Sequence, residues 1–232
     1  SGRLVWAGAG RDRQTVERFL DALGHQRCEQ IELVSCDMAS WIAGPVADRL
    51  PGAVRCVDPF HVVQLATDAL DDVRREVWNE ARKSGQDQLA RRLKGARYAL
   101  WKNPENLTGR QQAKLAMIQQ TNRRLYRAYL LKEQLRQIYR LEPGPAIALL
   151  DAWIAWARRC RLPSLAKLAT TICAQRAGIV AAIEHGLSNA RVEAINTQIR
   201  LITRRAFGFH SADALIALAM LTLAGLCPPL PR

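Results

Sequence analysis

Two aspartates follow predicted β-strands, and their positions suit the binding of a divalent cation. Asp37 comes directly after the apolar run 31–36, and Asp58 follows the run 53–57. In an open α/β sheet, ligands bind at the edge formed by the carboxyl ends of the strands. Several anionic oxygens at such an edge can hold two divalent cations around a scissile phosphate. The pair therefore predicts a metal-assisted phosphoryl-transfer site.

Both aspartates also have a structural alternative. Asp37 precedes a predicted helix over residues 39–50, so its carboxylate could cap that helix. Asp58 stands before Pro59, where a turn role is equally ordinary. His61 could act as a general base, contact DNA or pack in the first turn of a helix. Spacing alone leaves these alternatives open.

A third acid, Glu193, lies in the stretch 188–211, which has the pattern of one long amphipathic helix. Apolar residues at intervals of three and four predict a stripe packed on a core, namely Val192, Ile195, Ile199, Ile202 and Ala206. A polar stripe one position further round consists of Asn189, Glu193, Asn196, Arg200 and Arg204. Glu193 therefore lies on the polar face of this helix. The alternative is a solvated surface helix without a functional role.

The elements that must position these acids are α/β in the first quarter of the chain. Short apolar runs predict strands over residues 4–9, 31–36 and 53–57. A helix is predicted between Asp12, which can cap it, and Gly24, which can end it. A second helix is predicted over residues 39–50, where Gly44-Pro45 should break or kink it.

From Phe60 onward the pattern is helical. Periodicity and Gly or Pro breaks predict helices over residues 60–84, 86–101, 109–140, 144–160 and 164–185. The last predicted helix, residues 212–226, is nearly all apolar and should be buried.

The charge balance favours a nucleic-acid partner. The 232 residues include 34 Lys and Arg against 21 Asp and Glu, a formal net charge of +13 at pH 7. Such an excess favours a polyanion over a small-molecule substrate. Among the cations of the predicted middle helices are Arg91, Arg92, Lys94, Arg97, Lys102, Arg110, Lys114, Arg123, Arg124 and Arg127.

Cysteine use and hydropathy indicate a cytosolic protein. The six cysteines lack a C-x-x-C pair, which argues for reduced, mostly buried thiols. His25 and Cys28 have the spacing of half a metal site, but no matching half is found. No signal peptide is present, and no apolar run reaches the roughly 18 residues of a membrane span. The chain begins with Ser1, which suggests part of a longer protein.

Four runs of the sequence together resemble a known family. They are GRDRQTVERFLDALG, VSCDMA, VDPFHVVQLATDALDDVRR and SNARVEAINTQIRLITRRAFGF. They resemble the catalytic domain of bacterial insertion-sequence transposases of the DDE type, specifically the ISL-three family. The resemblance implies a helix-dominated α/β chain with a partial RNase H-like fold and a large all-helical insertion before the last catalytic helix. It also implies three acids that bind two divalent cations, usually Mg²⁺ or alternatively Mn²⁺.

By motif, the second acid of the family falls on Asp37 and the third on Glu193, so both are expected catalytic residues and metal ligands. Asp58 is an additional candidate acid. The first acid has no counterpart, because residues 1–11 contain no Asp or Glu and Asp12 has the position of a helix cap. The chain is therefore expected to begin near the third strand of the fold. The arginines expected to contact DNA phosphates are Arg200, Arg204 and Arg205.

The resemblance implies three parts: a partial RNase H-like core with three strands over residues 1–76, a helical insertion over 77–186, and completing C-terminal helices over 187–232. The implied function is metal-dependent cleavage and strand transfer of double-stranded DNA, at transposon ends and targets. It would take place in the bacterial cytoplasm in association with the nucleoid, and a homo-oligomer on the DNA is compatible with it.

Because no first acid is identifiable, the enzymatic activity of this chain is left open. The alternative is a non-catalytic, basic, helical DNA-binding remnant of a transposase. Cation binding that depends on Asp37 would distinguish the two. An RNA-binding protein has little support, since only 6% of the residues are aromatic.

Overall fold

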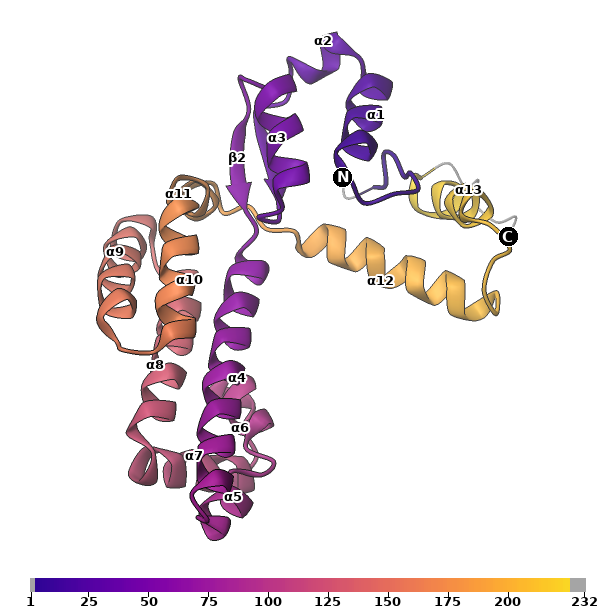
Figure 1. Ribbon diagram of the computed structural model, residues 1–232. Helices are drawn as coiled ribbons and strands as arrows, with labels where there is room; N and C mark the ends of the chain where they lie inside the picture. The colour runs from indigo at the N-terminus through magenta and orange to yellow at the C-terminus, as the bar shows by residue number, and fades with distance from the viewer. Residues whose placement is uncertain (1–2, 226–232) are drawn as a thin grey trace. The chain divides into compact units, whose positions relative to one another are not determined.

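The computed structural model describes residues 3–225, which form a helix-dominated chain with one small parallel sheet (Figure 1). This confirms the helix-dominated α/β class. The chain divides into two compact units. One combines Ser1–Asp58 with Gly186–Arg232, and the other, here called the helical unit, is Pro59–His185. The predicted division at residues 76 and 186 stays a prediction.

The sheet has two parallel strands, β1 (Leu33–Cys36) and β2 (Val54–Val57). Helix α3 (Ser40–Arg49) connects them, which is the crossover that parallel neighbours require. The register runs from Leu33 opposite Val54 to Cys36 opposite Val57. Two of the three predicted strands are therefore confirmed.

The predicted strand over residues 4–9 is wrong, since this segment has no regular secondary structure. A strand is stable only when a neighbouring strand accepts and donates its backbone hydrogen bonds. Here the Leu4 N–H donates instead to the Leu223 carbonyl at 3.0 Å. The Trp6 ring packs on that of Phe19, with 5.5 Å between centroids. Trp6 thus packs on α1, while Val5 is 62% exposed.

Helix α1 (Arg13–Leu23) forms as predicted. The Asp12 carboxylate caps it by accepting from the Thr15 N–H at 2.8 Å, and Gly24 ends it with a φ of 83°. The short helix α2 (His25–Cys28) follows. The buried core under these helices consists of Leu20, Cys28, Val46 and Leu50.

The predicted break at Gly44-Pro45 does not occur, because α3 continues through Pro45. A proline inside a helix removes one N–H donor. Its ring is buried here, so packing compensates for the lost hydrogen bond.

The helical unit contains eight α-helices and one short 3₁₀ helix within the described residues. They are α4 (Pro59–Lys83), α5 (Asp87–Leu93), α6 (Arg97–Trp101), η1 (Pro104–Asn106), α7 (Gly109–Thr121), α8 (Arg123–Ile138), α9 (Pro143–Arg159), α10 (Pro163–Ala174) and α11 (Arg176–His185). Three predicted helices are split, and the one expected over 164–185 is interrupted at Gln175, between α10 and α11. The expected helix over 86–101 is interrupted at Gly95, which has a φ of 74°. The expected helix over 109–140 is interrupted at Asn122, whose side chain caps α8 by accepting from the Leu125 N–H at 2.8 Å.

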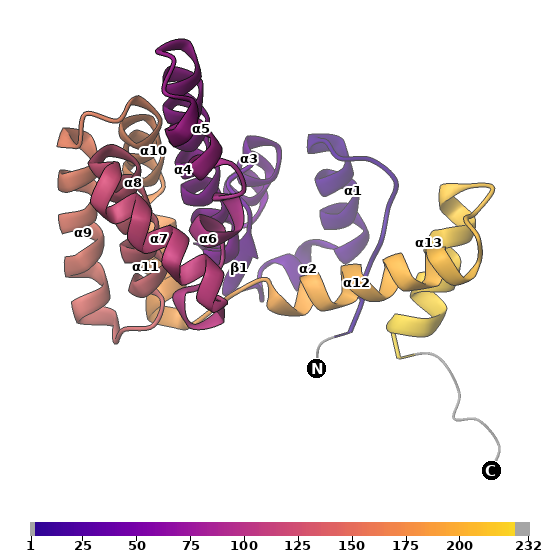
Figure 2. The same ribbon diagram turned by 90° about the horizontal axis from the view of Figure 1, so that it is seen from below.

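The core of the helical unit lies where α4 packs on α8 and α10, and where α9 packs on α8 and α10 (Figure 2). Its largest fully buried side chain is Trp153 of α9. The indole N–H of Trp153 donates to the Leu131 carbonyl of α8 at 2.8 Å. Apolar burial and this hydrogen bond together join the two helices.

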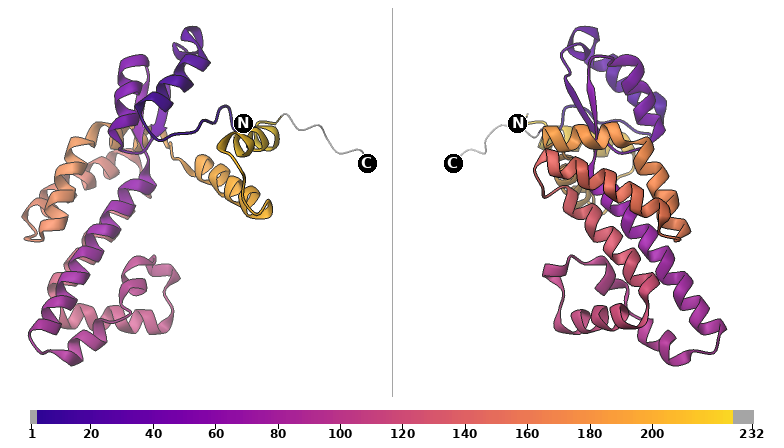
Figure 3. Two further views of the ribbon diagram at one scale, coloured as in Figure 1. Left: turned by 45° about the vertical axis from the view of Figure 1, so that its right-hand side comes forward. Right: turned by 90° about the vertical axis from the view of Figure 1, so that its left-hand side faces the viewer.

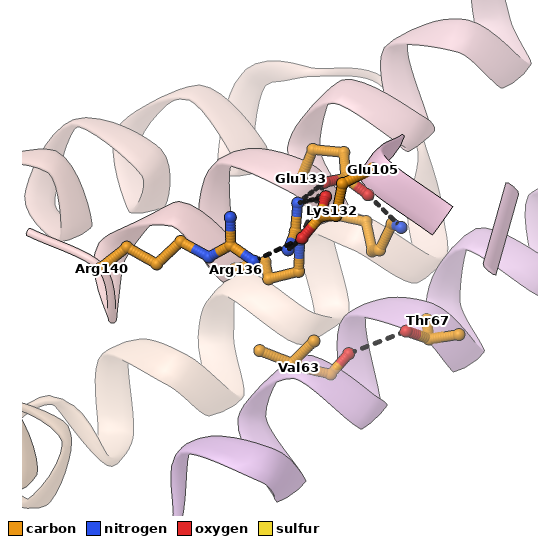
Figure 4. Close-up of polar contacts among 7 residues, drawn as sticks. All are labelled: Val63, Thr67, Glu105, Lys132, Glu133, Arg136 and Arg140. Carbon is orange, nitrogen blue, oxygen red and sulfur yellow. Dashed lines mark hydrogen bonds and ion pairs between the residues drawn. The ribbon is translucent and has the colours of Figure 1, made fainter. Parts of the chain in front are cut away.

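A chain of charged residues runs along α8 (Figure 4). Arg136 and Arg140 both bind Glu105, at 3.2 and 2.6 Å, and Arg136 also binds Glu133 at 2.9 Å. Lys132, only 1% exposed, contacts Glu133. Burial lowers the pKa of Lys132, and Glu133 opposes this shift. The pKa of Glu105 is lowered to about 2 by hydrogen bonds from Arg140, from the backbone of Glu105 itself and from Arg136.

The pKa of Glu105 gives a pH-dependent contribution to stability. Its folded pKa of about 2 lies below the unfolded value, so the unfolded chain binds more protons and stability falls as pH drops from about 4.5 toward 2. We expect the free energy of unfolding of Glu105→Gln, measured with urea between pH 5 and 2.5, to depend less steeply on pH than that of the unmodified chain. Glu142→Gln, an exposed glutamate without an ion pair in the described residues, is the control. If the free energy of unfolding of Glu105→Gln depended on pH as steeply as that of the unmodified chain, the lowered pKa of Glu105 would be contradicted.

The C-terminal helices α12 (Ala190–Arg205) and α13 (Ala212–Leu223) are less buried than predicted. No residue of α12 is buried, and in α13 only Ala219 is. Val192 is 52% exposed and Leu221 50%. An apolar stripe is buried only where another element covers it, and α12 packs mainly on α13 in the described part of the chain. Leu226, the predicted end of the last helix, lies outside the described residues.

Within residues 3–225, the helices are too short or too polar to cross a membrane. The five cysteines of this range, Cys28, Cys36, Cys56, Cys160 and Cys173, are all free thiols, and all but Cys173 are buried. Burial raises the pKa of Cys36 and of Cys56. These thiols are therefore neutral and unreactive at physiological pH.

Candidate functional site

The carboxyl edge of the sheet carries two acids. Cys36 and Val57 are the last residues of the paired strands, and each is followed by an aspartate. The N–H of Asp58 donates to the Cys36 carbonyl at 2.9 Å, so the parallel pairing extends one bond beyond β2. Asp37 and Asp58 are therefore placed at the same edge, where a parallel α/β sheet binds ligands.

Asp37 performs a local structural role at this edge. It is partly buried, and its Oδ1 accepts a hydrogen bond from the Ala39 N–H at 2.9 Å. This is an Asx turn that leads into α3, as the turn alternative predicts. The helix-cap alternative is wrong, because the N-cap of α3 is Ala39 and no side chain caps it. The bond uses one of the two carboxylate oxygens and fixes the direction of the other.

Asp58 connects the edge to a remote part of the chain. It is 1% exposed, and its Oδ1 accepts from the backbone N–H of Asn189 at 3.1 Å. Asn189 is the residue before α12, 131 positions away. Since a buried carboxylate is costly without hydrogen bonds, this contact stabilises the approach of α12 to the sheet edge.

The side chain of Asn189 adds a further oxygen. Its Oδ1 is buried and has no hydrogen-bond partner within the described residues. The only signal in the sequence was its place on the same helical stripe as Glu193. Its contact with Asp58 was missed, because no local pattern relates positions so far apart.

Glu193 lies in the first turn of α12 and is exposed. Its N–H donates to the Asn189 carbonyl at 2.9 Å, so the two residues are one helical turn apart. A carboxylate at this end of a helix is favoured by the positive pole of the helix dipole. The hydrogen bond between Asp58 and Asn189 therefore holds the first turn of α12, which carries Glu193, at the sheet edge that carries Asp37.

The donor atoms around this edge fit a hard divalent cation in their chemistry. Carboxylate and amide oxygens are the ligands that Mg²⁺ and similar ions prefer. Within residues 3–225, however, no three or more His, Cys, Asp or Glu side chains are grouped so that they could hold an ion. His25 instead pairs with Glu29 at 3.4 Å, and the Cys28 thiol is buried.

The arginines predicted to contact phosphates are exposed, whereas His61 is half-buried. The side chains of Arg200, Arg204 and Arg205 are exposed on α12 and form no ion pair with any described residue. They can therefore bind an anion without breaking an existing contact. The ring of His61 lies edge-on to that of Phe60, with 5.9 Å between centroids.

Comparison with known proteins finds one matching family model and several similar relatives. Residues 1–219 match the model of the ISL-three (ISL3) DDE family, described as a transposase. The transposase for insertion sequence element IS1557 from two Mycobacterium tuberculosis strains, CDC 1551 and H37Rv, is 54% identical over 100% of this chain and 56% of the relative. The transposase for insertion sequence element IS1001 from Bordetella parapertussis is 32% identical over 91% of this chain and 52% of the relative.

The chain spans about half the length of these curated relatives. No solved structure matches it.

Proposed function

Because this chain belongs to the ISL3 family of DDE transposases, we propose that it forms the larger part of a catalytic domain that cuts and joins double-stranded DNA in transposition. The observation that carries the proposal is the hydrogen bond between Asp58 and the Asn189 N–H. It brings the start of the helix with Glu193 to the sheet edge with Asp37. The proposed core is RNase H-like, and the proposed setting is the bacterial nucleoid.

In this proposal Asp37 and Glu193 are the ligands of a divalent cation, with Asp58 and the Asn189 Oδ1 as additional oxygens. A bound Mg²⁺ or Mn²⁺ would neutralise phosphate charge and lower the pKa of an attacking water. Asp58 positions the start of α12, and the Asx turn of Asp37 orients its second oxygen. Arg200, Arg204 and Arg205 bind phosphates and thereby hold the DNA without reading its sequence.

The second candidate is a DNA-binding remnant without catalysis. The observation that favours it is that Asp37, Asp58 and Glu193 are not grouped closely enough in the described structure to hold an ion together. The two candidates share DNA binding and differ in their response to cations.

We expect calorimetry to detect weak Mn²⁺ binding by the unmodified chain, and Asp37→Asn to weaken it by at least about tenfold, because a ligand oxygen loses its charge. Duplex-DNA affinity without the cation should stay within about twofold, since removing one carboxylate changes a net charge of +13 little. Asp68→Asn on the exposed face of α4 is the matched control and should bind Mn²⁺ like the unmodified chain. Equal Mn²⁺ binding by Asp37→Asn and the control would support the remnant.

A further inference from the structure

Residues 82–123 of the helical unit concentrate positive charge. They contain ten Lys and Arg but only two acids, Asp87 and Glu105. More than half of the net charge of the chain therefore originates in this segment, which we call the basic tip. Its cations are Arg82, Lys83, Arg91, Arg92, Lys94, Arg97, Lys102, Arg110, Lys114 and Arg123. All are exposed except Lys114, which is half-buried.

The cations of the basic tip form no ion pairs within the described residues, whereas several arginines of the neighbouring helices do. Elsewhere in the helical unit, Arg124 binds Glu76 and Glu80 and Arg176 binds Asp151. Within the described residues, none of the ten tip cations forms an ion pair. Glu105 is already bound by arginines outside the segment. Unpaired like charges repel one another and destabilise the folded state, so a polyanion is their natural partner.

The fold gathers these cations from separate helices. Helix α5 packs on α4, and α6 on both α4 and α7, so the short helices lie together at one end of α4 (Figure 3, left). The Lys114 ammonium of α7 donates to the Lys94 carbonyl after α5 at 2.8 Å. Arg110 and Lys114 are four residues apart and share one face of α7. The helices that carry these cations are thus gathered at one end of α4.

Two arginines of the basic tip are held by aromatic rings. The guanidinium of Arg97 lies 3.7 Å from the centroid of the Trp101 ring, and that of Arg82 lies 4.8 Å from the Trp78 ring. Stacking orders the planar guanidinium and leaves its N–H edges available for phosphate oxygens. It also covers the ring faces on which bases would stack.

We propose that the basic tip is a second DNA-binding surface, which binds the phosphates of a DNA duplex independently of the acid-bearing sheet edge. Single-stranded DNA or RNA would need open aromatic platforms. Tyr98, 58% exposed, is the one strongly exposed aromatic side chain of the described tip. The inference rests on the proposed function for the identity of the polyanion, and it adds the place of contact.

The test uses the whole 232-residue chain and a fluorescently labelled duplex of about 20 base pairs. The variant is Arg91→Gln, Arg92→Gln and Lys94→Gln together. The matched control, Arg158→Gln, Arg159→Gln and Lys167→Gln, removes three exposed cations from α9 and α10 of the same unit. Anisotropy titrations across 50–250 mM salt give the affinity and its salt dependence, and circular dichroism verifies that each variant is folded.

We expect the tip variant to bind at least about tenfold more weakly at low salt, with the slope of log K against log salt reduced by about 2–3, since each lost phosphate contact removes about one unit. The control should stay within about threefold, with an unchanged slope. Equal slopes for a folded tip variant and the control would overturn the inference alone. No binding by the unmodified chain at low salt would instead contradict the proposed function, and stronger competition by single-stranded RNA than by duplex would show a different partner for the tip.

Discussion

Glu193→Gln should abolish DNA cleavage in a protein extended at the N-terminus by an acid-bearing strand, with a loss of about 10³-fold or more. The glutamine keeps the shape of the side chain but lacks the negative charge that binds a divalent cation. Cleavage of a labelled duplex carrying a transposon end, followed on a denaturing gel with Mg²⁺, measures the effect.

The fold and the DNA affinity should survive this substitution. Glu193 is exposed, and its only hydrogen bonds in the described structure are those of its backbone. Glu184→Gln, an exposed residue of α11, is the matched control and should cleave at the normal rate. Retained cleavage by Glu193→Gln would remove it from the proposed ligands.

The same cleavage assay can be applied to the 232-residue chain without an N-terminal extension. Because only Asp37 and Glu193 match acids of the family triad, we expect little or no cleavage, since a two-metal site needs enough anionic ligands for both ions. Mg²⁺-dependent nicking by this chain would point to Asp58 as the completing acid. Asp58→Asn should then abolish the nicking.

Trp153→Ala is expected to destabilise the helical unit by about 3–5 kcal/mol, the usual cost of removing a buried aromatic side chain. Trp153 is fully buried, and the substitution also leaves the Leu131 carbonyl without its indole donor. Urea unfolding followed by circular dichroism gives the change in the free energy of unfolding. DNA binding should weaken under conditions in which the helical unit is unfolded, because this unit carries the basic tip.

Trp153→Phe separates volume from hydrogen bonding. It loses the N–H donor and the five-membered ring but retains much of the apolar volume, so its cost should be clearly smaller, about 1–2 kcal/mol. The half-buried Trp156 of the same helix offers a comparison, because Trp156→Ala should destabilise less than Trp153→Ala. A loss below about 1 kcal/mol for Trp153→Ala would contradict the packing of α9 on α8.

Several features were predictable because their causes are local. The cap at Asp12 and the stop at Gly24 directly flank α1, so the local sequence was sufficient to place that helix. The strand ends before Asp37 and Asp58 were recognisable from short apolar runs followed by a turn residue. The resemblance to the ISL3 family, carried by ordered motifs, was confirmed by the comparisons.

Other features depend on which segments meet in three dimensions. The run 4–9 has strand-like residues but no neighbouring strand, so it packs as an irregular segment. The stripe of α12 is periodic whether or not an element covers it, so its exposure could not be read from spacing. The bond between Asp58 and Asn189 joins residues 131 positions apart. Periodicity reports only neighbours along the chain, whereas burial and long-range hydrogen bonds arise when the chain folds back on itself.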